Sequence, residues 1–306
     1  DKFNYQVLDD TTKTRLSLKI QDGCNNRCAY CIIPFARGKS RSADSEFIVT
    51  QINNAVNKGF KEVVLTGIHI GQWGIDLGKS FVDLIREIEN NTKIPRYRLG
   101  SLNPLEITKE LLDVLEQSDK FCPHFHLSLQ SACNKTLKSM NRFYKVDYYL
   151  EQIDKINSMF DLPFLGSDII AGFAGETVED FELTRNNLVK SGLSQIHTFP
   201  YSVRKGTIGE TMPGQVSENE KKRRADIIKE ISRNKYCDFI SKNIGHICEV
   251  LIEKHPDRHT GNLKGVTRNY LSVQIKSERK DLFNTLQNVK LTKYEDGIIY
   301  GELILP

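Results

Sequence analysis

The sequence predicts an α/β fold of six parallel strand–helix units, followed by a small all-β module. Before residue 218, short β-rich runs alternate with longer segments of helical periodicity, and after residue 241 the segments become short and β-branched. Alternation of strands and helices implies parallel strands joined by crossover helices. Six units are fewer than the eight that close a complete barrel.

Each predicted strand is a short run rich in β-branched or aromatic residues. The six runs are Thr14–Ile20, Glu62–Thr66, Arg96–Ser101, His124–Leu129, Phe164–Ile170 and Ser194–Phe199. Between them, apolar residues recur at the spacing of one helix face, as in Ile48, Ile52 and Ala55 before Gly59. Because parallel-strand folds place their chemistry at the carboxyl ends of the strands, motifs directly after strands take priority.

The carboxyl-terminal third has a different sequence pattern. A charged helix is predicted over Glu218–Ser241, after which four short runs predict a small antiparallel β-barrel or a related all-β module. These runs are Cys248–Ile252, Tyr270–Ile275, Val289–Thr292 and Ile298–Leu303. We therefore divide the chain into a linker over residues 1–12, a core over residues 13–240 and a second domain over residues 241–306.

The bulk composition is that of an ordinary globular protein, with 39% hydrophobic and 27% charged residues. The net charge of +4 permits a polyanionic partner without arguing for one. No apolar run approaches the ~20 residues that span a bilayer, so no membrane partner is predicted. The chain begins without a methionine or an apolar signal segment, and we expect it to be a fragment of a longer protein.

Three of the seven cysteines form a C-x-x-x-C-x-x-C motif directly after the first predicted strand: Cys24, Cys28 and Cys31. Three thiolates on one loop can bind three irons of a cubane cluster and leave the fourth iron open to a ligand. Structural zinc is the alternative, although it requires four ligands and the sequence has no second pair. Disulfide frameworks spread cysteines more evenly, so the clustering favours a cytoplasmic metal site. The other cysteines are isolated: Cys122, Cys133, Cys237 and Cys248.

The cysteine spacing, with the aromatic Tyr30 before the third cysteine, resembles the signature of radical S-adenosylmethionine (SAM) enzymes. This resemblance implies a [4Fe–4S] cluster whose open iron binds the amino and carboxylate groups of SAM. Electron transfer from the cluster then yields a 5′-deoxyadenosyl radical, a reaction that belongs to the cofactor and is positioned by the protein. The resemblance also implies a partial (β/α)6, TIM-like barrel.

Further segments resemble the methylthiotransferase family, in the order in which that family has them. They are Cys31–Gly38, Ser128–Cys133, Met140–Arg142, Ser167–Thr177 and Phe199–Thr207. Two more runs, Leu65–Gly71 and His197–Ser202, resemble the subgroup that acts on threonylcarbamoyladenosine in tRNA. The alternatives within the family act on isopentenyl adenosine or on a ribosomal protein. An alternative of another class is a non-catalytic, zinc-containing RNA-binding protein.

The resemblance implies a transferase that adds a methylthio group to carbon 2 of the adenosine next to the anticodon. Its partners would be the tRNA anticodon loop, a flavodoxin- or ferredoxin-like electron donor and a sulfur donor. Full-length family members carry a second [4Fe–4S] cluster on an amino-terminal domain. We therefore expect this chain to bind one cluster and SAM, and not to complete methylthiolation alone.

Candidate cofactor-binding residues follow successive predicted strands. Ser128 and Gln130 alternate along a strand and point the same way, and Asp168 stands in an apolar strand, where a carboxylate needs a partner. Each has a structural alternative: a turn for Thr66 and Gly67, a buried polar contact for Asp168, and a helix cap for Thr177. The full set of candidates is Tyr30, Thr66, Gly67, Ser128, Gln130, Arg142, Asp168, Gly172 and Glu176.

The carboxyl-terminal module resembles a TRAM domain, a small RNA-binding β-barrel. Basic side chains could neutralise phosphates, and aromatic rings could stack on unpaired bases. Acidic neighbours offset much of this charge, so a solvated surface is the alternative. The candidate RNA-binding residues are Arg37, Arg41, Lys264, Arg268 and Tyr270. We leave His69 and His197 outside the site, because a lone histidine near a strand end is more often structural.

Overall fold

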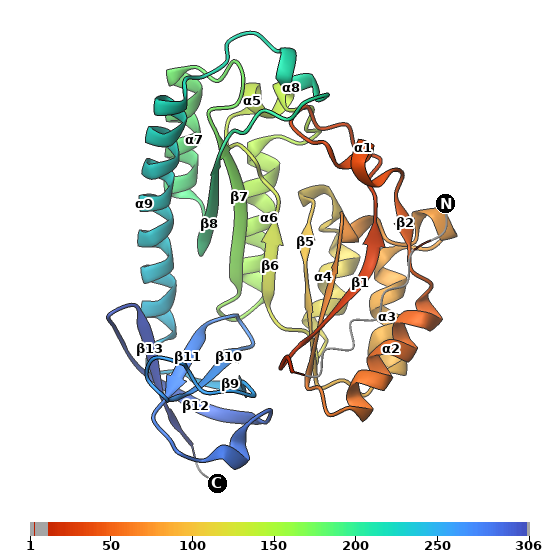
Figure 1. Ribbon diagram of the computed structural model, residues 1–306, viewed down its shortest axis with the longest axis vertical. Helices are drawn as coiled ribbons and strands as arrows, with labels where there is room; N and C mark the ends of the chain where they lie inside the picture. The colour runs from red at the N-terminus through yellow and green to blue at the C-terminus, as the bar shows by residue number, and fades with distance from the viewer. Residues whose placement is uncertain (1–2, 4–11, 305–306) are drawn as a thin grey trace.

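The computed structural model describes Phe3 and residues 12–304. The linker predicted over residues 1–12 therefore lies outside the described residues, apart from Phe3 and Thr12. Figure 1 shows two parts, an α/β part in which the strands run in parallel and a smaller β-barrel below the amino ends of those strands. Among the described helices, none is both long and apolar enough to cross a membrane.

Parallel strands form an open barrel made of two sheets. One sheet has the order β2-β1-β3-β4 and the other β5-β6-β7-β8. The backbone N–H of Gly100, between β4 and β5, donates to the Leu65 carbonyl at 2.9 Å, so these two short strands continue one another across the seam. The strands are β1 (Leu16–Asp22), β3 (Glu62–Gly67), β4 (Arg96–Leu99), β5 (Ser101–Leu102), β6 (His124–Leu127), β7 (Phe164–Ala171) and β8 (Gln195–Pro200).

The predicted partial barrel of six units is thus confirmed, with β4 and β5 counted as one strand. The sequence analysis missed β2 (Arg41–Ser42), a short strand that pairs antiparallel with β1. It carries no hydrophobic alternation, because it is only two residues long.

Helices cover the outer face of the barrel (Figure 1). Strand residues that point outward, such as Phe125 and Leu127, are fully buried against them. Helix starts are set by local chemistry, as at Ser80, whose hydroxyl and backbone form a capping box with Asp83. The covering helices are α2 (Ser45–Asn57), α3 (Phe81–Asn91), α4 (Lys109–Glu116), α6 (Val146–Met159), α7 (Val178–Lys190) and α9 (Glu218–Asn243).

Short helices and turns follow the carboxyl ends of the strands, where Figure 1 shows α1, α5 and α8. They are α1 (Ile33–Arg37), α5 (Asn134–Ser139) and α8 (Ile208–Thr211), with the 3₁₀ turns η1 (Ile70–Gln72), η2 (Ile75–Leu77) and η3 (Pro104–Glu106). The loops that join these pieces carry the predicted motifs, so the fold gathers the motifs at one end.

The carboxyl-terminal module is a closed barrel of five strands in the order β10-β11-β13-β12-β9. Most neighbours are antiparallel, and β11 pairs in parallel with β13, so the predicted small all-β barrel is confirmed with one parallel pair. The sequence analysis also missed β10, whose two polar or glycine positions weaken its β pattern. The elements are β9 (Ile247–Ile252), β10 (Leu263–Thr267), β11 (Ser272–Ile275), η4 (Lys280–Leu282), β12 (Leu286–Glu295) and β13 (Ile298–Leu303).

A buried ionic cluster joins the two parts at the amino ends of the strands. Arg96 and Arg98 both contact the Glu62 carboxylate, and all three residues are at most 1% exposed. Their remaining donors reach the second barrel: Arg96 Nη2 donates to the Val266 carbonyl at 3.1 Å and Arg98 Nη1 to the Arg268 carbonyl at 2.8 Å. Because buried charges need partners, these contacts hold the second barrel in place.

An aromatic side chain closes the same end of the barrel lumen. The ring centroid of Tyr270 lies 4.4 Å from that of His124 and 6.1 Å from that of Phe164. The Arg98 guanidinium lies over the tyrosine ring at 4.8 Å. Tyr270 and the ionic cluster therefore cover the amino-terminal end of the lumen, opposite the end that carries the motifs.

Candidate active site

The cysteine loop leaves β1 through a position that only glycine can occupy. Gly23 has a φ of +70°, and a Cβ there would lie 2.0 Å from the Lys39 carbonyl oxygen. This close approach lets the Cys24 N–H donate to the Gly38 carbonyl at 3.1 Å. The first cysteine is thus fixed directly at the end of a strand.

The middle of the loop is held by segments that come from far along the chain. The Ala29 N–H donates to the Met140 carbonyl at 3.0 Å, and the Ala29 carbonyl accepts from the Gly209 N–H at 2.7 Å. Asn141 donates from its side chain to the Arg27 carbonyl at 2.8 Å. One predicted family motif, Met140–Arg142, therefore meets the backbone of the cysteine loop, as does Gly209, two residues beyond the motif Phe199–Thr207.

The three cysteines of the motif line one cavity of about 230 Å³ and are each partly exposed. The other four cysteines do not line this cavity. Three thiolates with no fourth cysteine beside them suit a [4Fe–4S] cluster with one open iron. The donor set therefore fits the cluster that the motif predicts, with Cys24, Cys28 and Cys31 as its ligands.

A histidine and a glutamate support the first cysteine. His69 Nδ1 lies 3.6 Å from Cys24 Sγ, and His69 Nε2 pairs with Glu106 Oε1. Burial works against the charged imidazole, but the bonds to Cys24 and Glu106 raise the pKa of His69 to about 9. Burial would raise the pKa of Cys24, but hydrogen bonds from His69 and from the Asn26 N–H bring it below the ordinary value. These partners favour the thiolate, which is the form that binds metal.

Arginine 142 brings positive charge to the second cysteine. Arg142 Nη1 donates to Cys28 Sγ at 3.7 Å, and Arg142 Nη2 donates to the Ser128 carbonyl at 2.9 Å. The Tyr144 hydroxyl accepts from Arg142 Nε at 3.1 Å and itself reaches the Ser128 carbonyl at 2.7 Å. The third cysteine differs, because burial raises the pKa of the Cys31 thiol. The positive charge of Arg142 therefore lies on the side of the loop that carries Cys28.

Several predicted cofactor residues meet at this cavity. Tyr30, Ser128, Gln130 and Arg142 line it together with the cysteines. Asp168 lines an adjoining cavity of about 250 Å³, which also touches Tyr30 and Gln130. The two cavities therefore meet at Tyr30 and Gln130, and a ligand that fills one would lie against the other.

Two predicted glycines make their close approaches to protein backbone or side chains. A Cβ on Gly67 would lie 2.4 Å from the Gln21 carbonyl oxygen, so this glycine lets β3 approach β1. A Cβ on Gly172 would lie 2.6 Å from Lys221 Cγ. Neither these glycines nor Thr66 line the two cavities described above. Their contact with a cofactor stays a prediction.

Glu176 has a protein partner for its carboxylate. It accepts from Arg224 Nη1 at 2.8 Å and from the Gly172 N–H at 2.8 Å, which ties the start of α7 to α9. Burial raises the pKa of the Glu176 carboxyl despite these bonds. Thr177 caps α7, as the structural alternative expects. The cofactor role predicted for Glu176 is not tested by these contacts.

The predicted RNA-binding residues fall into two groups. Arg37 is exposed beside the cysteine loop, Arg41 pairs with Asp22, and Lys264 pairs with Glu253. Arg268 and Tyr270 lie in the junction between the two parts. The Arg268 guanidinium donates to the carbonyls of Asp119 and Phe121 at 2.7 and 2.6 Å, so its donors are used within the protein.

Sequence reasoning missed His69, Glu106 and His126 as neighbours of the cavities. His69 and Glu106 both follow strand ends, which is the position where chemistry was expected, but neither forms a local motif with the cysteines. Their signal is spatial: 45 residues separate Cys24 from its histidine partner. His126 alternates with Ser128 on β6, and the same strand argument would have found it.

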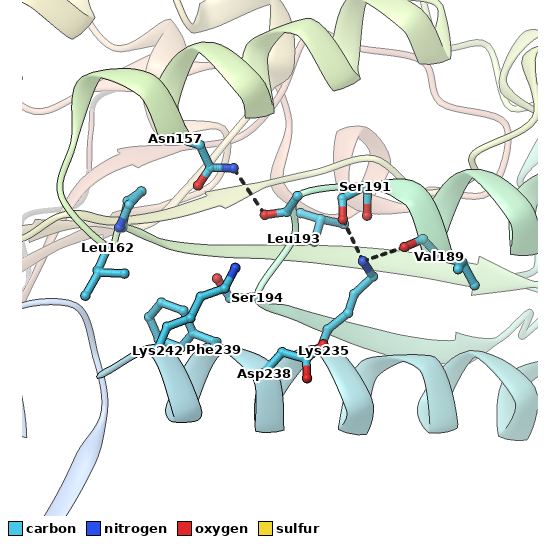
Figure 2. A pocket seen from close by; sticks show the side chains of 12 residues that line it. Asn157, Leu162, Val189, Ser191, Leu193, Ser194, Lys235, Asp238, Phe239 and Lys242 are labelled. Carbon is cyan, nitrogen blue, oxygen red and sulfur yellow. Dashed lines mark hydrogen bonds between the residues drawn. The ribbon is translucent and has the colours of Figure 1, made fainter. Parts of the chain in front are cut away.

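A further cavity of about 490 Å³ lies away from the cysteines, between α6, α7 and α9 (Figure 2). Lys235 reaches across it and donates to the carbonyls of Val189 and Ser191 at the end of α7, at 3.1 and 2.6 Å. Asn157 donates to the Gly192 carbonyl at 3.3 Å. Since these polar groups already have partners, we interpret this cavity as part of the packing of α9.

Comparison with known proteins agrees with this geometry. Residues 18–188 match the model of the radical SAM superfamily. The fold is similar to that of the radical SAM methyltransferase TsrM from Kitasatospora setae, with a TM-score of 0.54 and 15% identity over 63% of this chain and 38% of that one. The chain is a radical SAM protein, and such proteins bind a [4Fe–4S] cluster and SAM.

Relatives of higher sequence identity identify a family within the radical SAM superfamily. The chain is 37% identical over 305 residues to the threonylcarbamoyladenosine tRNA methylthiotransferase MtaB of Bacillus subtilis, covering 97% of this chain and 67% of that protein. It is 36% identical over 284 residues to the tRNA-2-methylthio-N(6)-dimethylallyladenosine synthase of Thermoanaerobacter sp. (strain X514), covering 92% of this chain and 60% of that protein. The chain therefore belongs to the radical SAM methylthiotransferases, a family of transferase enzymes, and spans about two thirds of these relatives.

Proposed function

We propose that this chain is the radical-generating core of a tRNA methylthiotransferase that acts on threonylcarbamoyladenosine next to the anticodon. The observation that carries this proposal is the meeting of two cavities at the carboxyl end of the barrel. One is lined by the three cysteines and the other by Asp168, Tyr201 and Arg204, with Tyr30 and Gln130 shared by both. A cofactor in the first would lie directly against a substrate in the second.

In this proposal the residues of the chain bind and orient. Cys24, Cys28 and Cys31 hold the cluster, with His69 beside Cys24 and Arg142 donating a hydrogen bond to Cys28. Ser128 and Gln130 offer polar groups to SAM. When bound, the cluster and SAM supply a radical that removes a hydrogen atom. The target is a weakly nucleophilic aromatic C–H, which ordinary acid–base chemistry does not activate.

The RNA partner is an unpaired anticodon loop, because an unpaired base enters a buried pocket at low cost. Arg37 is exposed beside the cysteine loop, which supports a contact with phosphates near the entrance, whereas Arg41 would first have to leave Asp22. Lys264 lies on the second barrel, which we propose to act as a TRAM-like RNA-binding domain. A protein that modifies tRNA works in the cytoplasm, so the predicted location follows from this substrate.

The remaining partners are also proposals. The complete reaction needs a flavodoxin- or ferredoxin-like electron donor, a sulfur donor and a second [4Fe–4S] cluster. The four cysteines outside the motif are Cys122, Cys133, Cys237 and Cys248, and they do not line the cavity of the cysteine motif.

Anaerobic reconstitution with iron and sulfide tests the core of the proposal. We expect about four irons per chain and a visible charge-transfer absorbance. Reduction with dithionite in the presence of SAM should release 5′-deoxyadenosine. A colourless protein that binds zinc and no sulfide would contradict the radical function and favour the RNA-binding alternative.

The substrate is tested separately in cells. Mass analysis of tRNA nucleosides from a strain that lacks the gene should show loss of methylthio-threonylcarbamoyladenosine. Loss of the methylthio form of dimethylallyladenosine would instead support the second candidate, which rests on the 36% identity to a synthase of that nucleoside. An altered ribosomal protein with intact tRNA would exclude both.

A further inference from the structure

A row of polar side chains crosses the barrel lumen beside the two cavities. It consists of Ser101, His126, Asp168 and His197, and we call it the lumen row. Strand register places these residues together, because Ser101 is paired with His126 and Asp168 with His197. Ser101 Oγ lies 2.9 Å from His126 Nδ1, and His126 Nε2 lies 3.2 Å from Asp168 Oδ1. The ring centroids of His126 and His197 are 5.6 Å apart.

The lumen row begins at the cysteine cavity, which Ser101 lines, and continues toward the amino ends of the strands. His126 lies on β6 and Ser128 directly follows the end of that strand, so His126 lies about 6–7 Å further in than Ser128. Asp168 lines the second cavity together with Gln130. Below the row, Tyr270 and the ionic cluster seal the lumen. The row therefore borders the space that a substrate would enter, with Ser101 at one cavity, Asp168 at the other and His126 between them.

The space around the row is kept open. Gly166 lies opposite His126 on β7, and a Cβ there would be only 3.1 Å from His126 Cδ2. The His126 side chain is 13% exposed, whereas His197 is largely exposed within the open lumen. Among the residues that the structure describes, none hydrogen-bonds to the His197 imidazole. The row thus combines an oriented His126–Asp168 pair with a free hydrogen-bonding group.

Two chemistries could use such a row. A metal ion is one, but both ring nitrogens of His126 already face protein partners, Ser101 on one side and Asp168 on the other. Asp168 instead contacts His126 directly. The other chemistry is recognition of a polar organic group by hydrogen bonds, which needs one acceptor and one donor facing the same space. Asp168 supplies the acceptor and the His197 ring supplies the donor.

We propose that the lumen row recognises the substituent on N6 of the target adenosine and selects threonylcarbamoyl over dimethylallyl. This inference rests on the proposed function and adds the residues that determine its specificity. The threonylcarbamoyl group carries a hydroxyl that can donate to Asp168, and a ureido carbonyl and a carboxylate whose oxygens can accept from His197. The dimethylallyl group has neither.

The two N6 substituents differ in what their binding at the lumen row costs. A dimethylallyl group would remove water from Asp168 and His197 without replacing the lost hydrogen bonds. Leaving a buried polar group unpaired weakens binding by about 5- to 150-fold. Sites built to bond a hydroxyl or N–H group reject analogues that lack it far more strongly than apolar pockets reject polar isosteres. The row therefore discriminates chiefly by penalising the apolar substituent.

Binding to synthetic anticodon stem-loops tests this proposal. The loops are identical except for the adenosine, which carries threonylcarbamoyl, dimethylallyl or no N6 group, and fluorescence anisotropy gives each Kd for the reconstituted protein with SAM. We expect the wild-type protein to bind the threonylcarbamoyl loop at least about tenfold more tightly than the dimethylallyl loop. In His197→Leu this ratio should fall about tenfold, through weaker binding of the threonylcarbamoyl loop and equal or tighter binding of the dimethylallyl loop.

Two variants control for structural effects. Thr198→Val changes the next residue of β8, on the opposite side of the strand and at a hydroxyl with no hydrogen-bond partner within the described chain, so the ratio should not change. His197→Asn keeps a donor and should recover part of the discrimination. Iron content and far-UV circular dichroism should match the wild type for all three.

The outcomes separate this inference from the proposed function. If the wild-type protein selects the threonylcarbamoyl loop and His197→Leu keeps the same ratio, the lumen row does not read the substituent, although the proposed substrate stands. If the wild-type protein binds all three loops equally, prefers the dimethylallyl loop or binds none, the proposal is wrong at its premise. That result is visible before any variant is made.

Discussion

The two ends of the open barrel use charged and polar residues in opposite ways. At the amino ends of the strands, Glu62, Arg96 and Arg98 are almost completely buried and bond to one another and to carbonyls of the second barrel. At the carboxyl ends, the three cysteines are partly exposed and His197 is largely exposed to the lumen. One end is satisfied by protein groups, and the other leaves groups available to a ligand.

The difference lies in what covers each end and not in the strands themselves. β6 supplies His124 to the sealed end and His126 to the lumen row, only two residues apart. Burial and the nearby Arg98 and His126 lower the pKa of His124, whereas His126 contacts Ser101 and Asp168. The same residue type thus has a structural role under the second barrel and a proposed binding role above it.

The largest expected effect is at the open end. Cys28→Ala removes one cluster ligand and should abolish the iron–sulfur absorbance and all release of 5′-deoxyadenosine. The melting temperature should stay close to that of the wild-type protein without cluster, because the side chain is not part of either hydrophobic core. Full retention of iron and sulfide in this variant would show that another ligand replaces Cys28.

Substitutions at the sealed end should lower the stability of the folded protein. Glu62→Ala leaves Arg96 and Arg98 buried without their carboxylate, and breaking such a pair costs about 3–5 kcal/mol. Urea unfolding measures this loss. Glu110→Ala is the matched control, because Glu110 pairs with Arg86 on the surface and is 60% exposed. A change within about 0.5 kcal/mol is expected there. Equal effects of the two substitutions would mean that the buried cluster does not hold the junction.

The residues of the two ends differ in how far the sequence alone predicts their contacts. Local sequence patterns predict the strand order, the outer helices and the cysteine loop. These patterns are strand–helix alternation, helical spacing and three cysteines within eight positions. They do not predict the partners His69 and Glu106, because the contacts of these residues to the loop span long sequence separations. Local periodicity assigns residues to faces, but only the curvature of the sheet decides which faces meet.

The junction shows the same limit more sharply. Arg268 and Tyr270 have the composition of an RNA-binding surface, and the sequence supports that interpretation. In the structure their side chains contact Phe121 and His124 of the core, because the second barrel docks through this edge. Composition describes what a surface can bind, whereas docking between domains determines whether it is free.

Tyr270→Ala distinguishes these two interpretations. If the ring seals the lumen, the variant should lose about 1–3 kcal/mol of stability, less than for a fully buried aromatic residue because Tyr270 is 41% exposed. Its affinity for an anticodon stem-loop should change less than twofold. Lys264→Ala provides the contrast, with weaker RNA binding and a smaller dependence on salt. Weaker RNA binding by Tyr270→Ala at unchanged stability would restore the RNA-binding hypothesis.

The smallest effect concerns the pH dependence of stability at the sealed end. Burial, followed by the charges of Arg98, His126, Arg15 and His197, lowers the pKa of His124 well below its ordinary value of 6.5. When a histidine pKa is lowered by folding, the unfolded chain takes up the proton first, so stability falls as the pH drops below about 6.5.

The slope that His124 adds cannot exceed about 1.4 kcal/mol per pH unit. Glu62, whose pKa is also lowered, loses its contribution only below its ordinary value of 4.5, so the two windows are separate. Urea unfolding between pH 7 and 5 should therefore show a decline that His124→Leu flattens. A decline of equal slope in that variant would assign the effect to other groups and would leave the sealed end insensitive to pH in this range.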